Sequence, residues 1–152
     1  GMSFRMALYN KSDATVAKQK FQETPQGQWF TENCWKYGLI FRFPSDDYPN
    51  SSWEDKSYKT SVSLHLDLYR YVGIAHSEAM RIMDYCLEEY IEFLIDHPHI
   101  CIYKDGALQY EIVRITAEDA STYTVPVPNP ASSYIASLDN MGGVVLAYSY
   151  VD

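Results

Sequence analysis

Residues Val62 to Gly73 read V-S-L-H-L-D-L-Y-R-Y-V-G. In its first half, apolar and polar side chains alternate: Val62, Leu64, Leu66 and Leu68 against Ser63, His65 and Asp67. A repeat of two residues is typical of a strand with one buried face. We therefore predict a strand over Val62–Leu68 that runs on into Tyr69–Gly73, followed by a helix.

Upstream of this stretch, the sequence predicts short elements joined by loops. Residues 5–10 form a candidate strand. Thr24 and Pro25 are suited to the N-cap and first position of a helix, and Gly38 is suited to ending it. Leu39–Phe43 follows as a strand, and residues 45–60 are polar enough to predict a long surface loop.

Downstream, the chain changes character. Helices are expected over 74–85 and 87–95. Asp105-Gly106 between two apolar runs predicts a β-hairpin, 123–127 is a candidate edge strand, and 144–151 closes the chain as a strand. The predicted fold class is α+β, with helices packed on an antiparallel sheet and a C-terminal strand-rich extension. The expected division is 1–95 and 96–152, packed as one domain.

Composition excludes several classes of protein. The chain has 152 residues and a formal net charge of −8, so binding to nucleic acid is not expected. No apolar run reaches the length of a membrane span, and no secretory signal opens the chain. Its three cysteines are an odd number without C-x-x-C spacing, which favours buried free thiols over disulfides or a thiolate zinc site.

Three blocks of sequence resemble one family. They are W-F-T-E-N-C-W-K-Y-G-L-I-F-R-F-P at 29–44, Y-R-Y-V-G at 69–73, and His76 with L-E-E-Y at 87–90. In order and spacing they are similar to the VanY-like D-alanyl-D-alanine carboxypeptidases, zinc peptidases of bacterial cell-wall metabolism. The resemblance covers roughly residues 1–95, and the helices that precede the family's zinc motif are not found in this chain.

The resemblance also implies where the family's zinc ligands and general base should lie. The ligand positions fall on Ser3, Asn10 and Leu68, and the position of the base falls on His65. Leucine cannot bind zinc, and asparagine is a poor substitute for an anionic ligand. We therefore expect no metal cofactor and no catalysis by the family's mechanism, although the active family uses zinc.

Other side chains are candidates for binding. His65 and Asp67 would share one face of the predicted strand and could hold a metal, but a solvated polar face is the more common explanation. His97 and His99 form an H-x-H pair without a clear third ligand, so two exposed imidazoles are favoured. His76 is interpreted as structural. Arg70 and Trp53 complete the candidate ligand-binding residues.

The resemblance, together with the replaced ligand positions, predicts an inactive D,D-carboxypeptidase-like protein, which retains either binding of a peptidoglycan peptide or only the family's scaffold. One alternative is an active zinc peptidase whose ligands lie elsewhere in the chain or in another segment. A second alternative is an interaction module, such as a homodimer formed through the C-terminal strands. The sequence leaves the compartment open, and only the resemblance implies the cell envelope.

Overall fold

A computed structural model describes residues 2–46, 54–63, 65–117, 122 and 124–151 of the chain. These residues divide into two compact units, 1–88 and 89–152, which we describe separately. Trp53 and Leu64, both singled out by the sequence, lie outside the described residues.

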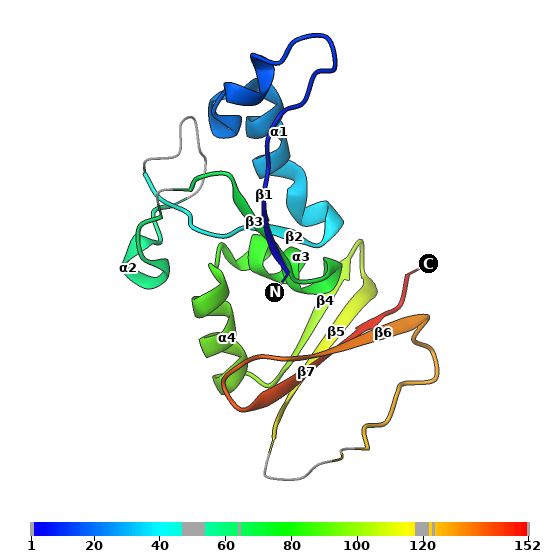
Figure 1. The fold of residues 1–152 in the computed structure, drawn as a ribbon. Coiled ribbons are helices and arrows are strands. Elements are labelled where there is room, and N and C mark those ends of the chain that lie inside the picture. The colour runs from blue at the N-terminus through cyan, green and yellow to red at the C-terminus, as the bar shows by residue number, and fades with distance from the viewer. Residues whose placement is uncertain (1, 47–53, 64, 118–121, 123, 152) are drawn as a thin grey trace. The chain divides into compact units, whose positions relative to one another are not determined.

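The first unit contains a three-stranded antiparallel sheet in the order β1-β3-β2 (Figure 1). The strands are β1 (Ser3–Arg5), β2 (Leu39–Phe41) and β3 (Leu68–Tyr71). The predicted strand is therefore confirmed over Leu68–Tyr71 but wrong over its earlier described residues, 62–63 and 65–67, because β3 begins only at Leu68. A strand persists only where neighbouring strands accept and donate its hydrogen bonds, and β1 and β2 are long enough to pair only with Leu68–Tyr71.

The first unit also contains short helices. They are η1 (Val16–Lys18), η2 (Phe21–Glu23), α1 (Pro25–Asn33), η3 (Cys34–Tyr37), α2 (Ser57–Thr60) and α3 (Ile74–Met83). The predicted N-cap is confirmed, since the Thr24 hydroxyl accepts a hydrogen bond from the Gly27 amide at 3.1 Å. Gly38 ends η3 with a φ of 77°, and a Cβ there would lie 2.8 Å from the Tyr71 ring.

Tyr69 lies at the centre of the core of the first unit. Its side chain is fully buried, and its ring meets the rings of Phe21, Phe30 and Phe41 at centroid distances of 6.2, 4.8 and 5.8 Å. Its hydroxyl is 2.5 Å from the hydroxyl of Thr31 on α1. Alternation along β3 therefore turns Tyr69 into the core and turns Leu68 and Arg70 to the opposite face.

The second unit is built on a four-stranded antiparallel sheet in the order β4-β5-β7-β6. The strands are β4 (His99–Lys104), β5 (Ala107–Thr116), β6 (Ser133–Leu138) and β7 (Gly143–Ser149). Helix α4 (Leu87–Asp96) precedes them, and its first two residues, including Glu88, still belong to the first unit. The predicted hairpin is confirmed, with Asp105 and Gly106 at φ values of 52° and 79°, as a tight two-residue turn requires.

The edge strand predicted at 123–127 is wrong over its described residues, since 124–127 form no strand. Pro126 and Pro128 lack the amide hydrogens that a ladder needs. The outer position beside β7 is taken instead by β6, whose six residues are all exposed.

A buried ion pair between Arg114 and Asp139 stabilises the turn between β6 and β7. The Asp139 carboxylate accepts hydrogen bonds from the Met141 and Gly143 amides at 2.7 and 2.8 Å, and from Arg114 Nε at 2.6 Å. Burial opposes ionisation of Asp139, but these amides and the guanidinium more than offset it and lower the pKa of the carboxyl. The carboxylate thus links β5 to the turn.

Helices and antiparallel sheets together confirm the predicted α+β fold class. Among the described helices, none has the length and apolarity needed to cross a membrane.

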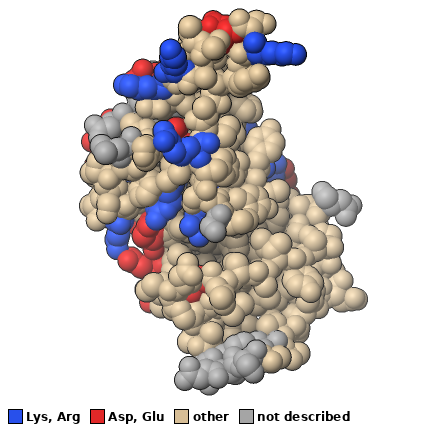
Figure 2. Space-filling view, in the orientation of Figure 1, with Lys and Arg blue, Asp and Glu red and all other residues tan. Residues whose placement is uncertain are grey.

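Charge is unevenly divided along the sequence: residues 89–152 carry two Lys or Arg against nine Asp or Glu, a formal net charge of −7. On the face shown in Figure 2, most of the visible Lys and Arg side chains lie on the first unit.

Candidate functional site

The face of the first sheet opposite Tyr69 carries two of the three positions at which the family's zinc ligands were expected, Ser3 and Leu68. Arg5 on β1 is paired in register with Leu68, and the Arg42 amide donates to the Leu68 carbonyl at 3.1 Å. The next row across the sheet is Ser3, Arg70 and Ile40. Residues directly opposite in an antiparallel ladder share a face. Ser3 and Leu68 therefore lie on the same face of the sheet. We call this face the arginine face; its residues are Arg5, Leu68, Arg42, Ser3, Arg70 and Ile40.

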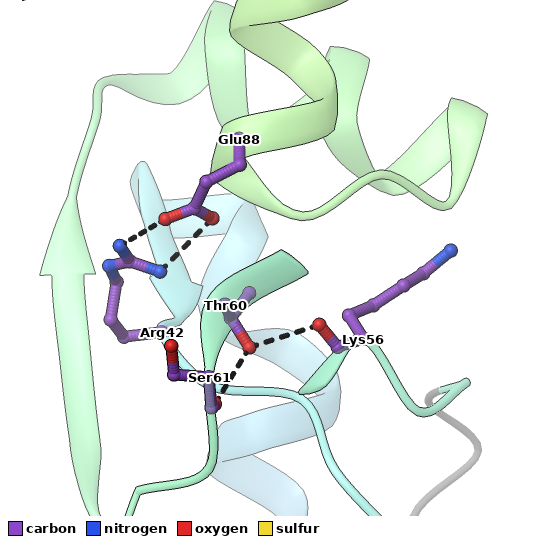
Figure 3. Close-up of polar contacts among 5 residues, drawn as sticks. All are labelled: Arg42, Lys56, Thr60, Ser61 and Glu88. Atoms are coloured by element: carbon purple, nitrogen blue, oxygen red, sulfur yellow. Dashed lines mark hydrogen bonds and ion pairs between the residues drawn. The ribbon is translucent and has the colours of Figure 1, made fainter. Parts of the chain in front are cut away.

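Two of the three arginines are paired with carboxylates. Arg5 binds Asp67 in a forked contact, with its Nε 3.0 Å from each carboxylate oxygen. Arg42 and Glu88 form a second bidentate pair across the first unit, in which Arg42 Nη1 is 3.2 Å from Glu88 Oε2 (Figure 3). Such forks fix the two planar groups relative to one another. Leu68 is thus flanked on both sides by guanidinium groups whose charges are balanced.

Arg70 differs from the other two. It is half-buried, and among the residues that the structure describes none forms an ion pair with it. It lies on the same face as Leu68, two residues further along β3, and directly opposite Ser3. A partly desolvated guanidinium without a carboxylate partner is suited to binding an anionic group.

His65 and Asp67 do not share a strand face, contrary to the prediction. They lie in the loop that leads into β3, where His65 is exposed and its amide donates to the Ser63 hydroxyl at 3.0 Å. Figure 3 shows how this loop begins: the Thr60 hydroxyl donates to the carbonyls of Lys56 and Ser61. Ser61 has a φ of 68°, so the chain bends before an extended strand can form.

Asn10 lies away from the arginine face along the sequence, in a turn after β1. Its side-chain oxygen accepts the Ser12 amide at 2.9 Å, which is a local Asx turn. The first unit also contains a pocket of about 570 Å³, and its lining includes Arg5, Met6, Lys18, Phe21, Leu66 and Asp67. The pocket therefore adjoins the Arg5–Asp67 pair.

Sequence reasoning missed Arg5 and Arg42 as parts of this site. Arg42 lies within the first family-like block, so that block contained a signal for it. No pattern in the sequence singled out Arg5, because only pairing of β1 with β3 places it beside Leu68 and Asp67.

The remaining sequence candidates are separated from the arginine face along the chain. His97 follows α4 and stacks on Phe93 with ring centroids 4.3 Å apart, whereas His99 begins β4.

All three cysteines are free thiols, as predicted, but only Cys34 and Cys86 are buried, and Cys101 is exposed. Burial raises the pKa of Cys34 to about 12, so that thiol stays protonated near neutral pH.

His76 on α3 is 5% exposed, and burial lowers its pKa to about 4. The unfolded chain, in which a histidine has a pKa near 6.5, binds the proton more readily. We therefore expect stability to be complete above about pH 6.5 and to fall by about 3 kcal/mol as the pH drops to 4. Denaturant titrations between these pH values should show the loss. His76→Gln should flatten this dependence, whereas exposed His97→Gln should leave it unchanged.

Three comparisons place the chain among known proteins. It is 33% identical to a D-alanyl-D-alanine carboxypeptidase of Enterococcus faecium over 134 residues, 88% of this chain and 40% of that relative. It is 28% identical to VanXYC of Enterococcus gallinarum, a bifunctional D-Ala-D-Ala dipeptidase and carboxypeptidase, over 62% of this chain and 45% of the relative. No model of a protein family matches.

The fold is shared with a solved structure. The D,D-dipeptidase VanXYg, crystallised with a D-Ala-D-Ala phosphinate analogue, matches 98% of this chain and 56% of its own chain, with a TM-score of 0.75 and 23% identity. The chain spans less than half the length of the two curated relatives. Over that shared part, it is related to the VanY-like D,D-peptidases.

Proposed function

We propose that this chain is part of a cell-wall D,D-peptidase-like protein that binds a D-alanyl-D-alanine peptide without cleaving it by the zinc mechanism. Kinship with D-Ala-D-Ala carboxypeptidases supports the substrate class. The second part, the absence of cleavage by the zinc mechanism, is supported by the row Arg5–Leu68–Arg42, in which a leucine lies at an expected ligand position.

The donor set at the family's ligand positions does not fit zinc. Ser3 offers a neutral hydroxyl, the Asn10 oxygen is used in its local turn, and Leu68 has no donor atom. Zinc is bound by thiolates, imidazoles and carboxylates. Asp67, the carboxylate that precedes Leu68 in the sequence, is already held in a fork by Arg5, and a divalent cation would have to compete with that guanidinium.

Arg70 is proposed as the group that binds the carboxylate end of the peptide. It is a half-buried arginine on the face that carries Ser3 and Leu68, and it has no acidic partner among the described side chains. A guanidinium can bind a terminal carboxylate through two parallel hydrogen bonds. The pocket beside Arg5 and Asp67 supplies space for the preceding part of a peptide.

Calorimetric titration with a peptide ending in D-alanyl-D-alanine tests this proposal. We expect binding to the wild type and a loss of about tenfold or more in affinity for Arg70→Gln, because a charge-assisted hydrogen bond contributes about 1.5–3 kcal/mol. Amidation of the peptide's carboxyl end should weaken binding by a similar factor. Lys104→Gln, which removes an equal charge from the second unit, should bind like the wild type.

A hydrolysis assay tests the second part. With added Zn²⁺, we expect no release of D-alanine from the same peptide. Release that stops on chelation would favour the alternative of an active zinc peptidase.

The homodimer stays a prediction. The side chains of β6 are exposed and leave room for a second copy of the chain, and sedimentation at high protein concentration would show whether a dimer forms.

A further inference from the structure

Three side chains that can bind a metal converge on the sheet of the second unit. His99 Nε2 is 2.8 Å from Glu111 Oε1 and 3.8 Å from Cys101 Sγ, and the ligand atoms of the three residues all lie within 4.8 Å of one another. In a tetrahedral zinc site, a nitrogen and a sulfur ligand are roughly 3.5 Å apart, given bond lengths of about 2.0 and 2.3 Å. The spacing already approaches that of a bound site.

Strand pairing produces this convergence. His99 and Cys101 are two residues apart on β4 and therefore share a face, and Glu111 on β5 lies directly opposite Cys101. The register shifts by one residue between Ile102 and Tyr103, which marks a β-bulge. Without this shift, Tyr110 would be opposite Cys101 and Glu111 would point to the other face.

A hydrogen bond from Tyr150 orients the carboxylate of Glu111. Tyr150 Oη donates to Glu111 Oε2 at 2.5 Å, which leaves Oε1 directed at His99. A phenol is protonated at neutral pH, so Tyr150 is the donor in this hydrogen bond. Outer partners of this kind fix the orientation of metal-binding side chains.

The surroundings favour a cation. Residues 89–152 have a formal net charge of −7, and such a field attracts divalent ions. His99 and Cys101 are exposed, so an ion can enter from solvent. Partial desolvation and the charge of Glu111 raise the pKa of Cys101, and a bound cation would reverse this effect by stabilising the thiolate.

We propose that His99, Cys101 and Glu111 bind a divalent transition metal of the Zn²⁺ class, with a fourth position open to solvent. One nitrogen, one sulfur and one carboxylate oxygen suit this borderline-soft ion, and an open fourth position is typical of sites that bind a further ligand. These three residues belong to the second unit and those of the arginine face to the first, and the test of the metal site does not depend on the proposed peptide binding.

The metal-free full chain should be titrated with Zn²⁺ against a chromogenic chelator, and with Co²⁺ as a spectroscopic probe. We expect one ion per chain and a thiolate-to-cobalt charge-transfer band in the near ultraviolet. Binding should tighten as the pH rises, since the ion displaces the thiol proton. Cys101→Ser should abolish the band. His99→Ala and Glu111→Gln should weaken Zn²⁺ binding by about 100-fold, and Tyr150→Phe by about tenfold.

Matched variants separate this site from others in the chain. Cys86→Ser, His97→Ala and Asp96→Asn change a thiol, an imidazole and a carboxylate outside the cluster, and His65→Ala changes the family's base position. All four should bind Zn²⁺ as the wild type does. The proposal is overturned if the wild type binds no better than the variant lacking all three ligands, or if His65→Ala or His97→Ala abolishes binding.

Discussion

Replacing Tyr69 by alanine should destabilise the first unit by about 3–5 kcal/mol, the range for removing a large aromatic side chain from a core. Tyr69 is fully buried, contacts three other aromatic rings, and bonds to Thr31. Its removal leaves a cavity that those rings can fill only in part. Because a domain is stable by only about 5–15 kcal/mol, the loss should leave the unit close to unfolding.

Tryptophan fluorescence is the appropriate measurement for this effect. All three tryptophans, Trp29, Trp35 and Trp53, belong to the first unit, so their emission during denaturant unfolding reports on that unit alone. Tyr71→Ala is the matched control, since Tyr71 is on the same strand but 41% exposed, and it should cost less than half as much. Tyr69→Phe should lose about 1 kcal/mol, the contribution of one hydrogen bond. Equal losses for Tyr69→Ala and Tyr71→Ala would contradict the assigned core.

Replacing Asp139 by alanine should have a comparable effect on the second unit, about 3–5 kcal/mol, the usual cost of breaking a buried ion pair on one side. The Arg114 and Asp139 side chains are 6% and 3% exposed. The substitution would leave a buried guanidinium without its carboxylate, and two turn amides without their acceptor. Asp139→Asn keeps an oxygen for the amides and should cost less.

Hydrogen exchange resolved along the chain can measure this loss in the strands themselves. We expect Asp139→Ala to speed exchange in β5, β6 and β7, because Asp139 links the β6–β7 turn to Arg114 on β5. Asp96→Ala removes an exposed carboxylate from α4 and should change exchange little. Protection in β5 and β7 that is unchanged by Asp139→Ala would show that the pair does not fasten the turn.

Local patterns predicted several features correctly because their cause lies in a few adjacent residues. Thr24 and Pro25 begin α1, Gly38 ends the following turn, and Asp105-Gly106 forms the hairpin. Each depends on backbone angles or capping groups within about four residues. The α+β class and the resemblance to D,D-peptidases also followed from the sequence, and both are confirmed.

The alternation in Val62–Leu68 was misleading for the same physical reason. Periodicity describes which side chains could share a face, but a strand also needs a partner along its length. The pairing available to β3 begins at Leu68, so His65 and Asp67 lie in a loop and Asp67 pairs with Arg5 instead. The candidate site is therefore a sheet face and not a pair of alternating ligands.

The sequence by itself determined the N-cap of α1, the glycine that ends η3, the hairpin turn, the fold class and the family of the relatives, since these depend on local chemistry and on matched blocks. Tertiary structure alone decided which distant side chains meet. Register places Arg5 and Arg42 beside Leu68, and a one-residue bulge turns Glu111 toward His99 and Cys101. Register depends on hydrogen bonding between separate strands, and a single shifted residue moves a side chain to the other face of the sheet.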